Sequence, residues 1–181
     1  MRRAFLIVGF NNWGKTTLVY DLFRKERFLV GYGYRLHPDV GQRFTVESHS
    51  NDDTGEQRYI DLIHRRVQAA PADAQDLVSV LCPSRKSSNE PSNDACRILA
   101  SPAFAPFDEI HLLLLRYKWD LHAELRLADV QAYFQNCGSQ RLSLHVIDEG
   151  THGTDEERKQ RRCTLAHGII SGVLAASATT A

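Results

Sequence analysis

The sequence has no excess of either charge and no long apolar run near its start. Its 22 lysines and arginines equal its 22 aspartates and glutamates, so the formal net charge is zero with neutral histidines. Proteins that bind nucleic acid or an anionic membrane through a general positive field carry a basic excess, so neither partner is expected. The apolar run at residues 4–8 is too short for a signal peptide or a membrane span. We interpret it as a buried strand.

Metal-cluster and hydrolase motifs are also missing. The eight histidines form no HExxH spacing, and no serine lies in a GxSxG sequence, so zinc hydrolases and serine hydrolases have no support. The cysteines are widely spaced, unlike a zinc site or the disulfide framework of a secreted protein. They are Cys82, Cys96, Cys137 and Cys163. We therefore expect reduced cysteines and a cytoplasmic location, with Cys82 and Cys137 as small buried residues.

The sequence does contain apolar stretches that alternate with segments of helical period. This alternation is typical of βαβ units and a mainly parallel sheet. We predict a single three-layer α/β domain over residues 1–181, with a mostly parallel five-stranded sheet, helices on both faces and a frayed tail at 177–181. The strands are predicted at 4–8, 43–48, 77–82, 110–116 and 142–147. The helices are predicted at 14–25, 54–69, 92–100, 127–136 and 155–175.

A phosphate-binding motif lies between the first strand and the first helix. The segment Gly9-Phe10-Asn11-Asn12-Trp13-Gly14-Lys15-Thr16 matches GxxxxGK[ST] at every defined position. Its glycines allow a sharp turn and a close approach of the backbone, so that successive N–H groups and the helix N-terminus face an anion. Lys15 would reach the β- and γ-phosphates of a nucleotide, and Thr16 would place its hydroxyl on Mg²⁺.

This segment resembles the phosphate loop of the P-loop NTPase superfamily, and the order of elements agrees over the whole chain. The resemblance implies a bound nucleotide and Mg²⁺. Trp13 is unusual in such a loop, and it is expected either to stack on a base or a partner or to pack over the loop. The residues expected to contact the nucleotide are Gly9, Asn11, Asn12, Trp13, Gly14, Lys15, Thr16 and Thr17.

One interpretation is a small P-loop kinase. The stretch LVSVLCPSRKSSN, the helix after it and the strand FDEIHLLLL resemble the middle of adenylyl-sulfate-kinase-type domains. That arrangement implies that strand 77–82 lies beside the P-loop strand and that the polar strand 43–48 lies at the sheet edge. The acceptor would lie over the polar residues Glu47, His49, Asp52 and Asp53. One of the two aspartates would orient or deprotonate the acceptor hydroxyl, and Lys15 would stabilise the transferred group.

The expected cations of this kinase site lie outside the phosphate loop. Their guanidinium and ammonium groups would neutralise phosphate charge, although each also fits a solvated loop. They are Arg85, Lys86 and Arg97. The arginine-rich lid of such kinases has no counterpart after residue 116. The basic run on the last helix is expected to face solvent, and it consists of Arg158, Lys159, Arg161 and Arg162.

A second interpretation is a relative of the Ras-like GTPases. The segment 52–59 resembles their DxxG region, and YKWD at 117–120 resembles the guanine-reading NKxD. The resemblance implies that Lys118 packs over the base and that Asp120 accepts hydrogen bonds from guanine. Tyr117 stands where the family has asparagine, and no SAK-like triplet follows the last strand. The guanine signature is therefore incomplete, and ATP is the preferred nucleotide with GTP as the alternative.

A third interpretation is a nucleotide-dependent binding module without catalysis. No acid follows strand 77–82, which ends in Cys82-Pro83-Ser84, so a Walker B residue is missing there. Asp148 and Glu149 resemble a Walker B pair, but their strand is expected at the sheet edge far from Lys15. The sequence thus predicts Mg–NTP binding with phosphoryl transfer, hydrolysis or binding alone. The acceptor is a small molecule or a protein of unknown identity.

Overall fold

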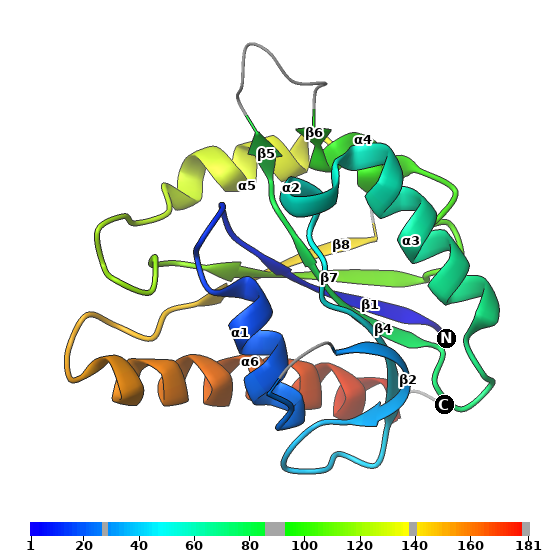
Figure 1. Ribbon diagram of the computed structural model, residues 1–181, viewed down its shortest axis with the longest axis horizontal. Helices are drawn as coiled ribbons and strands as arrows, with labels where there is room; N and C mark the ends of the chain where they lie inside the picture. Colours follow the sequence, from blue (N-terminus) through cyan, green and yellow to red (C-terminus); the bar gives the residue numbers. More distant parts are fainter. Residues whose placement is uncertain (27–28, 86–92, 138–140, 179–181) are drawn as a thin grey trace.

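The computed structural model describes residues 1–26, 29–85, 93–137 and 141–178. Its sheet has six strands in the order β2-β3-β4-β1-β7-β8 (Figure 1). The central strand β1 (Arg3–Val8) lies between β4 (Asp76–Leu81) and β7 (Glu109–Leu115), with β3 (Arg43–Glu47) and β8 (Leu142–Ile147) beyond them. All of these pairs are parallel. The mostly parallel α/β sheet is confirmed, and the predicted number of five strands is wrong.

The sixth strand is β2 (Val30–Arg35), which pairs antiparallel with β3 at the edge of the sheet. Its sequence VGYGYR has two glycines, which weaken the strand pattern that sequence analysis relies on. The strand at 43–48 was expected at or near the sheet edge, and at the edge itself in the kinase arrangement; it is the second strand from that edge. Its polar residues Thr45 and Glu47 are buried and hydrogen-bonded. The Thr45 hydroxyl donates to the Ala74 carbonyl at 2.7 Å, and Glu47 accepts from Arg66 at 3.1 Å.

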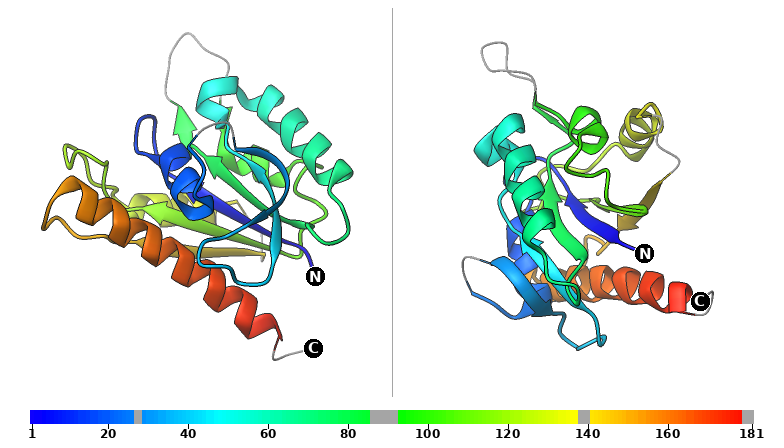
Figure 2. Two further views of the ribbon diagram at one scale, coloured as in Figure 1. Left: turned by 60° about the horizontal axis from the view of Figure 1, so that its bottom comes forward. Right: turned by 90° about the vertical axis from the view of Figure 1, so that its right-hand side faces the viewer.

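Helices cover both faces of the sheet (Figures 1 and 2). On one face lie α1 (Lys15–Phe23) and α6 (Asp155–Ala178), and on the other lie α3 (Glu56–Ala69), α4 (Ala95–Ala100) and α5 (Leu127–Gln135). The short α2 (Asn51–Thr54) leads from β3 into α3, and β5 (Ser84–Arg85) pairs with β6 (Asn93–Asp94) in a separate ladder. Each predicted helix is present with shifted ends.

Two of the shifted ends change a prediction. The helix expected over 92–100 begins only at Ala95, and Ser92 lies outside the described residues. Helix α6 continues to Ala178, so residues 177 and 178 of the predicted frayed tail are helical. Residues 179–181 lie outside the described part of the chain.

The core is built around β1, whose residues from Ala4 to Val8 are fully buried. Strands of a parallel sheet with helices on both faces are mainly apolar, and β1, β4 and β7 are buried along almost their whole length. Below β1, Phe5 contacts Phe44 edge to face, and Phe44 contacts Phe23 of α1 in the same way. Full burial of such a side chain contributes about 1.5–3 kcal/mol, so this packing fixes α1 against the sheet.

A disulfide joins Cys96 and Cys137, whose Cα atoms lie 5.1 Å apart. The prediction of reduced cysteines is wrong for this pair, and so is the interpretation of Cys137 as an ordinary buried residue. The two cysteines are 41 residues apart, and only the packing of α5 beside α4 brings them together. Cys82 is buried, as predicted. Within the described ranges, no helix combines the length and the apolar character that a membrane crossing requires.

Two histidines on adjacent strands make the stability depend on pH. His111 Nδ1 lies 3.1 Å from His145 Nε2, and the Phe5 ring stacks on His111. Burial lowers the pKa of both imidazoles below the ordinary value, although Glu109 beside His111 opposes this. The folded state then binds fewer protons than the unfolded state. This contribution to stability is complete above about pH 6.5 and is lost as the pH falls.

We expect urea unfolding to measure this contribution. Between pH 7.5 and pH 5.5 the wild type should lose more unfolding free energy than His145→Gln, because glutamine does not titrate. Equal losses in the two proteins would show that the histidine pair is not responsible.

Candidate functional site

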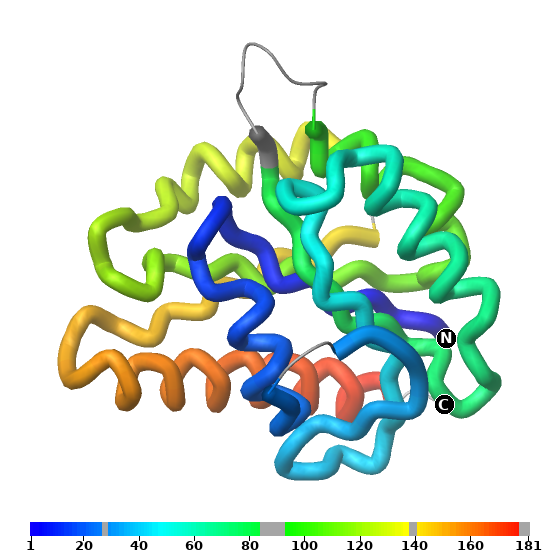
Figure 3. Tube along the Cα trace, in the orientation of Figure 1, coloured from blue at the N-terminus to red at the C-terminus, as the bar shows by residue number. Residues whose placement is uncertain are grey.

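The loops that follow β1, β3, β7 and β8 meet at one edge of the sheet, because the strands are parallel (Figure 3). The crevice outside the carboxyl ends of the strands is the usual ligand site of such sheets. A cavity of about 740 Å³ lies there. The predicted site residues that line it are Asn11, Asn12, Trp13, Gly14, Lys15, Thr16, Thr17, Asp52, Asp53 and Lys118. Gly9 and Asp120 do not line it.

The loop at residues 9–16, called here the 9–16 loop, has the backbone shape that its glycines suggest. Asn12 and Gly14 have φ of 59° and 85°, in the left-handed region. A Cβ on Gly9 would lie 3.2 Å from the Trp13 Cβ and 3.3 Å from Leu115 Cδ1, so a larger residue there would require these neighbours to shift by a few tenths of an ångström. Gly14 precedes α1 and has no side chain to cap it. The first N–H groups of α1 therefore lie at the cavity wall without a side-chain cap from Gly14.

Lys15 is held inside this loop. Its Nζ donates to the Phe10 carbonyl at 2.9 Å and lies 3.2 Å from Asp52 Oδ2. The two side chains of this ion pair are 5% and 3% exposed. The Thr16 hydroxyl donates to the Ser48 carbonyl at 3.2 Å, which ties the start of α1 to the end of β3. An ammonium group, a hydroxyl and a carboxylate thus lie on one side of the cavity.

A buried asparagine positions Asp52 and Asp53. Asn51 is fully buried, and its amide donates to the Cys82 carbonyl at 3.0 Å and to Asn93 Oδ1 at 2.8 Å. Its Oδ1 accepts from the Cys82 N–H at 2.6 Å. These bonds join α2 to the end of β4. Sequence analysis missed Asn51, because nothing in a polar stretch of aspartates and asparagine distinguishes a buried amide from an exposed one.

The cations of the cavity are paired with carboxylates. In the described part of the chain, five cationic side chains line the cavity, and each contacts an acid. The pairs are Lys15–Asp52, Lys118–Asp120, Lys159–Asp21, Arg158–Asp155 and Arg162–Glu149. An anionic ligand must therefore exchange with these carboxylates or arrive with a cation of its own.

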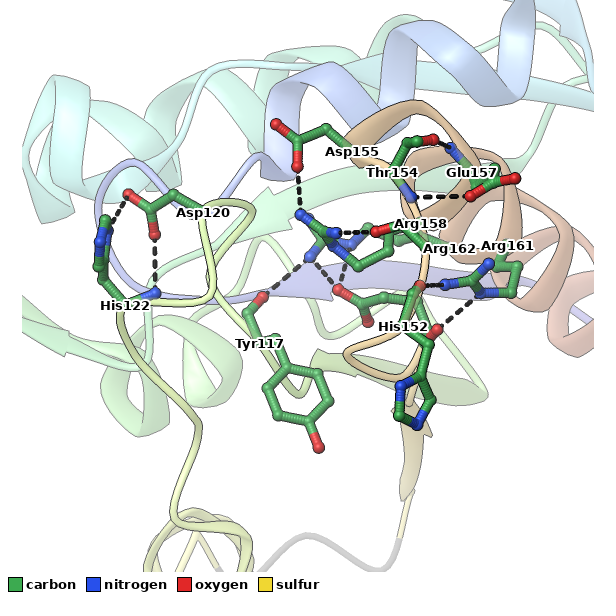
Figure 4. Close-up of polar contacts among 12 residues, drawn as sticks. Tyr117, Asp120, His122, His152, Thr154, Asp155, Glu157, Arg158, Arg161 and Arg162 are labelled. Atoms are coloured by element: carbon green, nitrogen blue, oxygen red, sulfur yellow. Dashed lines mark hydrogen bonds and ion pairs between the residues drawn. The ribbon is translucent and has the colours of Figure 1, made fainter.

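The residues of the guanine-reading interpretation contact each other. Lys118 Nζ lies 2.6 Å from Asp120 Oδ2. Asp120 also accepts from the His122 N–H at 3.1 Å (Figure 4). The hydrogen bond from Lys118 lowers the pKa of Asp120 to about 2. The structure does not bring Asp120 to the cavity wall, whereas Lys118 and Trp119 are there.

The aromatic surface of the cavity comes from a residue that sequence analysis did not select. Trp13 is 5% exposed and packs edge to face on Phe10, so it covers the loop, which was one of its two predicted roles. Trp119 lines the cavity and is 53% exposed. No sequence signal marked Trp119, because an exposed tryptophan in a loop belongs to no motif.

The acceptor region of the kinase interpretation is only partly assembled. Asp53 and Asp52 line the cavity, but Glu47 is fully buried and accepts from Arg66 Nε and from His49 Nδ1. Glu47 and His49 thus form a separate cluster. Of the expected cations, Arg97 pairs with Glu56 at 2.8 Å and does not line the cavity. Lys86 and the side chain of Arg85 lie outside the described residues.

The basic run on the last helix was predicted to face solvent, and this prediction is wrong for two of its four residues. Arg158 and Arg162 are 8% and 7% exposed and line the cavity, while Lys159 and Arg161 are exposed. Positions four residues apart share one helix face, and this face of α6 packs on α1 and the 9–16 loop. The spacing in the sequence shows that Arg158 and Arg162 share a helix face, but it does not show whether that face points to the solvent or to the cavity.

The acid pair after β8 is engaged by arginines. Asp148 contacts Arg116 at 2.5 Å, and Glu149 pairs with the buried Arg162. As predicted, β8 lies at the sheet edge, and neither acid lines the cavity. β4 is followed by Cys82 and Pro83, neither of them an acid. Asp52 is therefore the carboxylate nearest to Lys15 among the acids considered for magnesium.

The donors around Lys15 fit a magnesium ion. Mg²⁺ prefers oxygen ligands and is commonly held by one or two carboxylates together with substrate phosphates. The Thr16 hydroxyl and the Asp52 carboxylate line the same cavity and meet this requirement. No protein-family model matches the chain, and a search of curated proteins finds no significant match. The chemistry of this cavity is therefore the basis for assigning a function.

Proposed function

We propose that this protein is a P-loop kinase that binds Mg–ATP in the cavity and transfers its γ-phosphoryl group to a small acceptor. The observation that carries the proposal is the position of Lys15. It lies at the end of a glycine-bounded loop between the central strand β1 and the start of α1, in contact with the Asp52 carboxylate at the cavity wall. Backbone N–H groups at a helix N-terminus and one ammonium group are the usual recognition elements for a polyphosphate.

The order of the strands supports a kinase rather than a Ras-like protein. Strand β4 pairs with β1, and β3 lies one position further out. The kinase interpretation requires the strand at 77–82 beside the P-loop strand. The Ras-like interpretation would place the strand at 43–48 there. Asp52 then lies beside Lys15 at the cavity wall, where we place the acceptor.

The surroundings of Lys118 favour ATP over GTP. Asp120 is held by Lys118 and His122 and lies outside the cavity lining, so it is not placed to accept hydrogen bonds from guanine. The exposed ring of Trp119 offers a stacking surface that does not discriminate between bases. ATP is therefore the nucleotide that we assign to the site.

In the proposed reaction each residue near the cavity has a distinct role. Lys15 and the first N–H groups of α1 hold the β- and γ-phosphates. Thr16 and Asp52 would hold Mg²⁺, which neutralises phosphate charge. Asp53, exposed beside Asp52, orients the acceptor hydroxyl and takes its proton. The acceptor oxygen forms a bond to the γ-phosphorus, the bond from that phosphorus to the bridging oxygen breaks, and ADP leaves.

Calorimetry with Mg–ATP and Mg–GTP tests the assignment of the nucleotide. We expect ATP to bind at least as tightly as GTP, because Trp119 can stack on either base and Asp120 is not placed to read guanine. Asp120→Ala should change the affinities for ATP and GTP by the same factor, because it frees Lys118 in the cavity but removes no base-reading group. A preference for GTP that disappears in Asp120→Ala would favour the Ras-like interpretation. ATP binding without turnover on a panel of hydroxyl and phosphate acceptors would favour the binding module.

A further inference from the structure

A buried arginine from the last helix contacts the back of the 9–16 loop. Arg162 Nη1 donates to the Trp13 carbonyl at 3.0 Å, and Nη2 donates to the Tyr117 carbonyl at 2.9 Å. Its Nε donates to Glu149 at 3.0 Å. The guanidinium therefore joins three segments that follow β1, β7 and β8. Figure 4 shows its contact with Tyr117. The three segments surround the cavity on the side of α6.

The contact with Trp13 fixes the direction of a backbone N–H group. In a planar trans peptide the carbonyl of Trp13 and the N–H of Gly14 point in opposite directions. Because Arg162 holds the carbonyl, the Gly14 N–H points away from the guanidinium. A Cβ on Gly14 would lie 3.1 Å from Arg162 Nη1, so the glycine also makes room for the arginine. The shape of the loop and the presence of Arg162 therefore depend on each other.

The contact with Tyr117 extends the same arrangement to the aromatic wall of the cavity. Tyr117 directly precedes Lys118 and Trp119, which both line the cavity. The Lys118 N–H donates to the Ala123 carbonyl at 2.9 Å, which closes this loop on itself. Arg162 thus holds the phosphate side and the base side of the proposed nucleotide site in one fixed arrangement.

We propose that Arg162 is a positioning residue, which keeps the 9–16 loop in its anion-binding form and joins it to the loop that carries Trp119. Glu149 keeps the guanidinium in place and balances its charge. The ligand in this inference rests on the proposed function, but the effect on the loop is independent of any ligand. Arginine is required because its planar fork supplies donors in several fixed directions, whereas lysine has one compact ammonium group.

The variants must avoid leaving a buried charge without a partner. Glu149 is 3% exposed, so a single Arg162→Met change would strand its carboxylate and threaten folding. The double variant Glu149→Leu/Arg162→Met removes both charges together. Arg162→Lys is the second variant, which keeps the positive charge but cannot reach all three acceptors. Arg161→Gln is the matched control, since the neighbouring Arg161 donates to the carbonyls of Glu149 and His152 instead.

The two tryptophans of the chain provide a readout without nucleotide. Trp13 and Trp119 are both in the cavity wall, and Trp119→Phe leaves Trp13 as the sole tryptophan. Trp13 is 5% exposed and should resist acrylamide quenching. In the Trp119→Phe background, the double variant and Arg162→Lys should both increase the quenching of Trp13. Arg161→Gln should leave it unchanged.

The second readout is the affinity for Mg–ATP in proteins that keep Trp119. The double variant and Arg162→Lys should bind Mg–ATP at least about tenfold more weakly, the loss expected for one hydrogen bond to a charged group. A folded double variant with unchanged Trp13 quenching and unchanged affinity would overturn the role of Arg162. If the variants show increased quenching of Trp13 but the wild type binds no Mg–ATP, the result would support Arg162 as a positioning residue and refute the proposed function.

Discussion

Lys15→Ala should lower the affinity for Mg–ATP by about 100-fold or more, equivalent to about 2.7 kcal/mol. Lys15 Nζ lies inside the 9–16 loop, against the Phe10 carbonyl and Asp52, and alanine removes the ammonium group that would contact the β- and γ-phosphates. Charge-assisted hydrogen bonds to phosphate are among the strongest that a side chain can form. Calorimetry with Mg–ATP and Mg–ADP measures the loss directly.

The matched control is Lys25→Ala, which removes an exposed lysine just after the end of α1. Its affinity for Mg–ATP should equal that of the wild type. Lys15→Ala also leaves the buried Asp52 without its contact to Lys15, so its folding is checked by circular dichroism and its binding is measured well below the unfolding midpoint. An unchanged affinity in folded Lys15→Ala would refute the assignment of this lysine.

Asp52→Asn should largely abolish the gain in ATP affinity that magnesium gives the wild type. In the wild type, Asp52 faces the position expected for the phosphates, so ATP without Mg²⁺ meets a carboxylate next to Lys15. Removing that negative charge should increase the affinity for ATP in EDTA by about tenfold or more, given the size of charge interactions near a protein surface. The same variant should gain little affinity from added Mg²⁺ and should lose phosphoryl transfer.

Asp53→Asn is the comparison for this prediction, because Asp53 is the adjacent carboxylate of the same helix. It should keep the wild-type dependence of ATP affinity on Mg²⁺. Its rate of phosphoryl transfer should fall by about 10²–10⁴-fold, the usual contribution of a general base. Identical magnesium dependence in Asp52→Asn and the wild type would show that Asp52 neither binds the metal nor repels the phosphates.

The central elements of the fold could be predicted because their signals are local. The strands β1, β4, β7 and β8 are apolar runs with turn residues at their ends, and each was expected within one residue of its observed bounds. The 9–16 loop could be placed between a strand and a helix for the same reason. The edge strand β2 was missed because its glycines remove the side-chain pattern, and β3 was consequently placed at the edge.

The parts of the site that could not be predicted depend on contacts between distant segments. Arg162 contacts the Trp13 carbonyl although the two residues are 149 positions apart in the sequence. The helical period of the sequence reveals only that Arg158 and Arg162 share a helix face. Asn51 and Asn93 are 42 positions apart and resemble ordinary loop residues. The disulfide between Cys96 and Cys137 depends in the same way on how the helices pack. Helical period and polarity do not contain this information.

A competition titration of the wild-type protein, followed by the fluorescence of Trp13 and Trp119, tests the central claim most directly. The claim predicts a saturable change on addition of Mg–ATP, which inorganic tripolyphosphate suppresses and adenosine does not, because the phosphates supply most of the recognition. No saturable change at millimolar Mg–ATP would contradict the claim. Competition by adenosine but not by tripolyphosphate would contradict it as well.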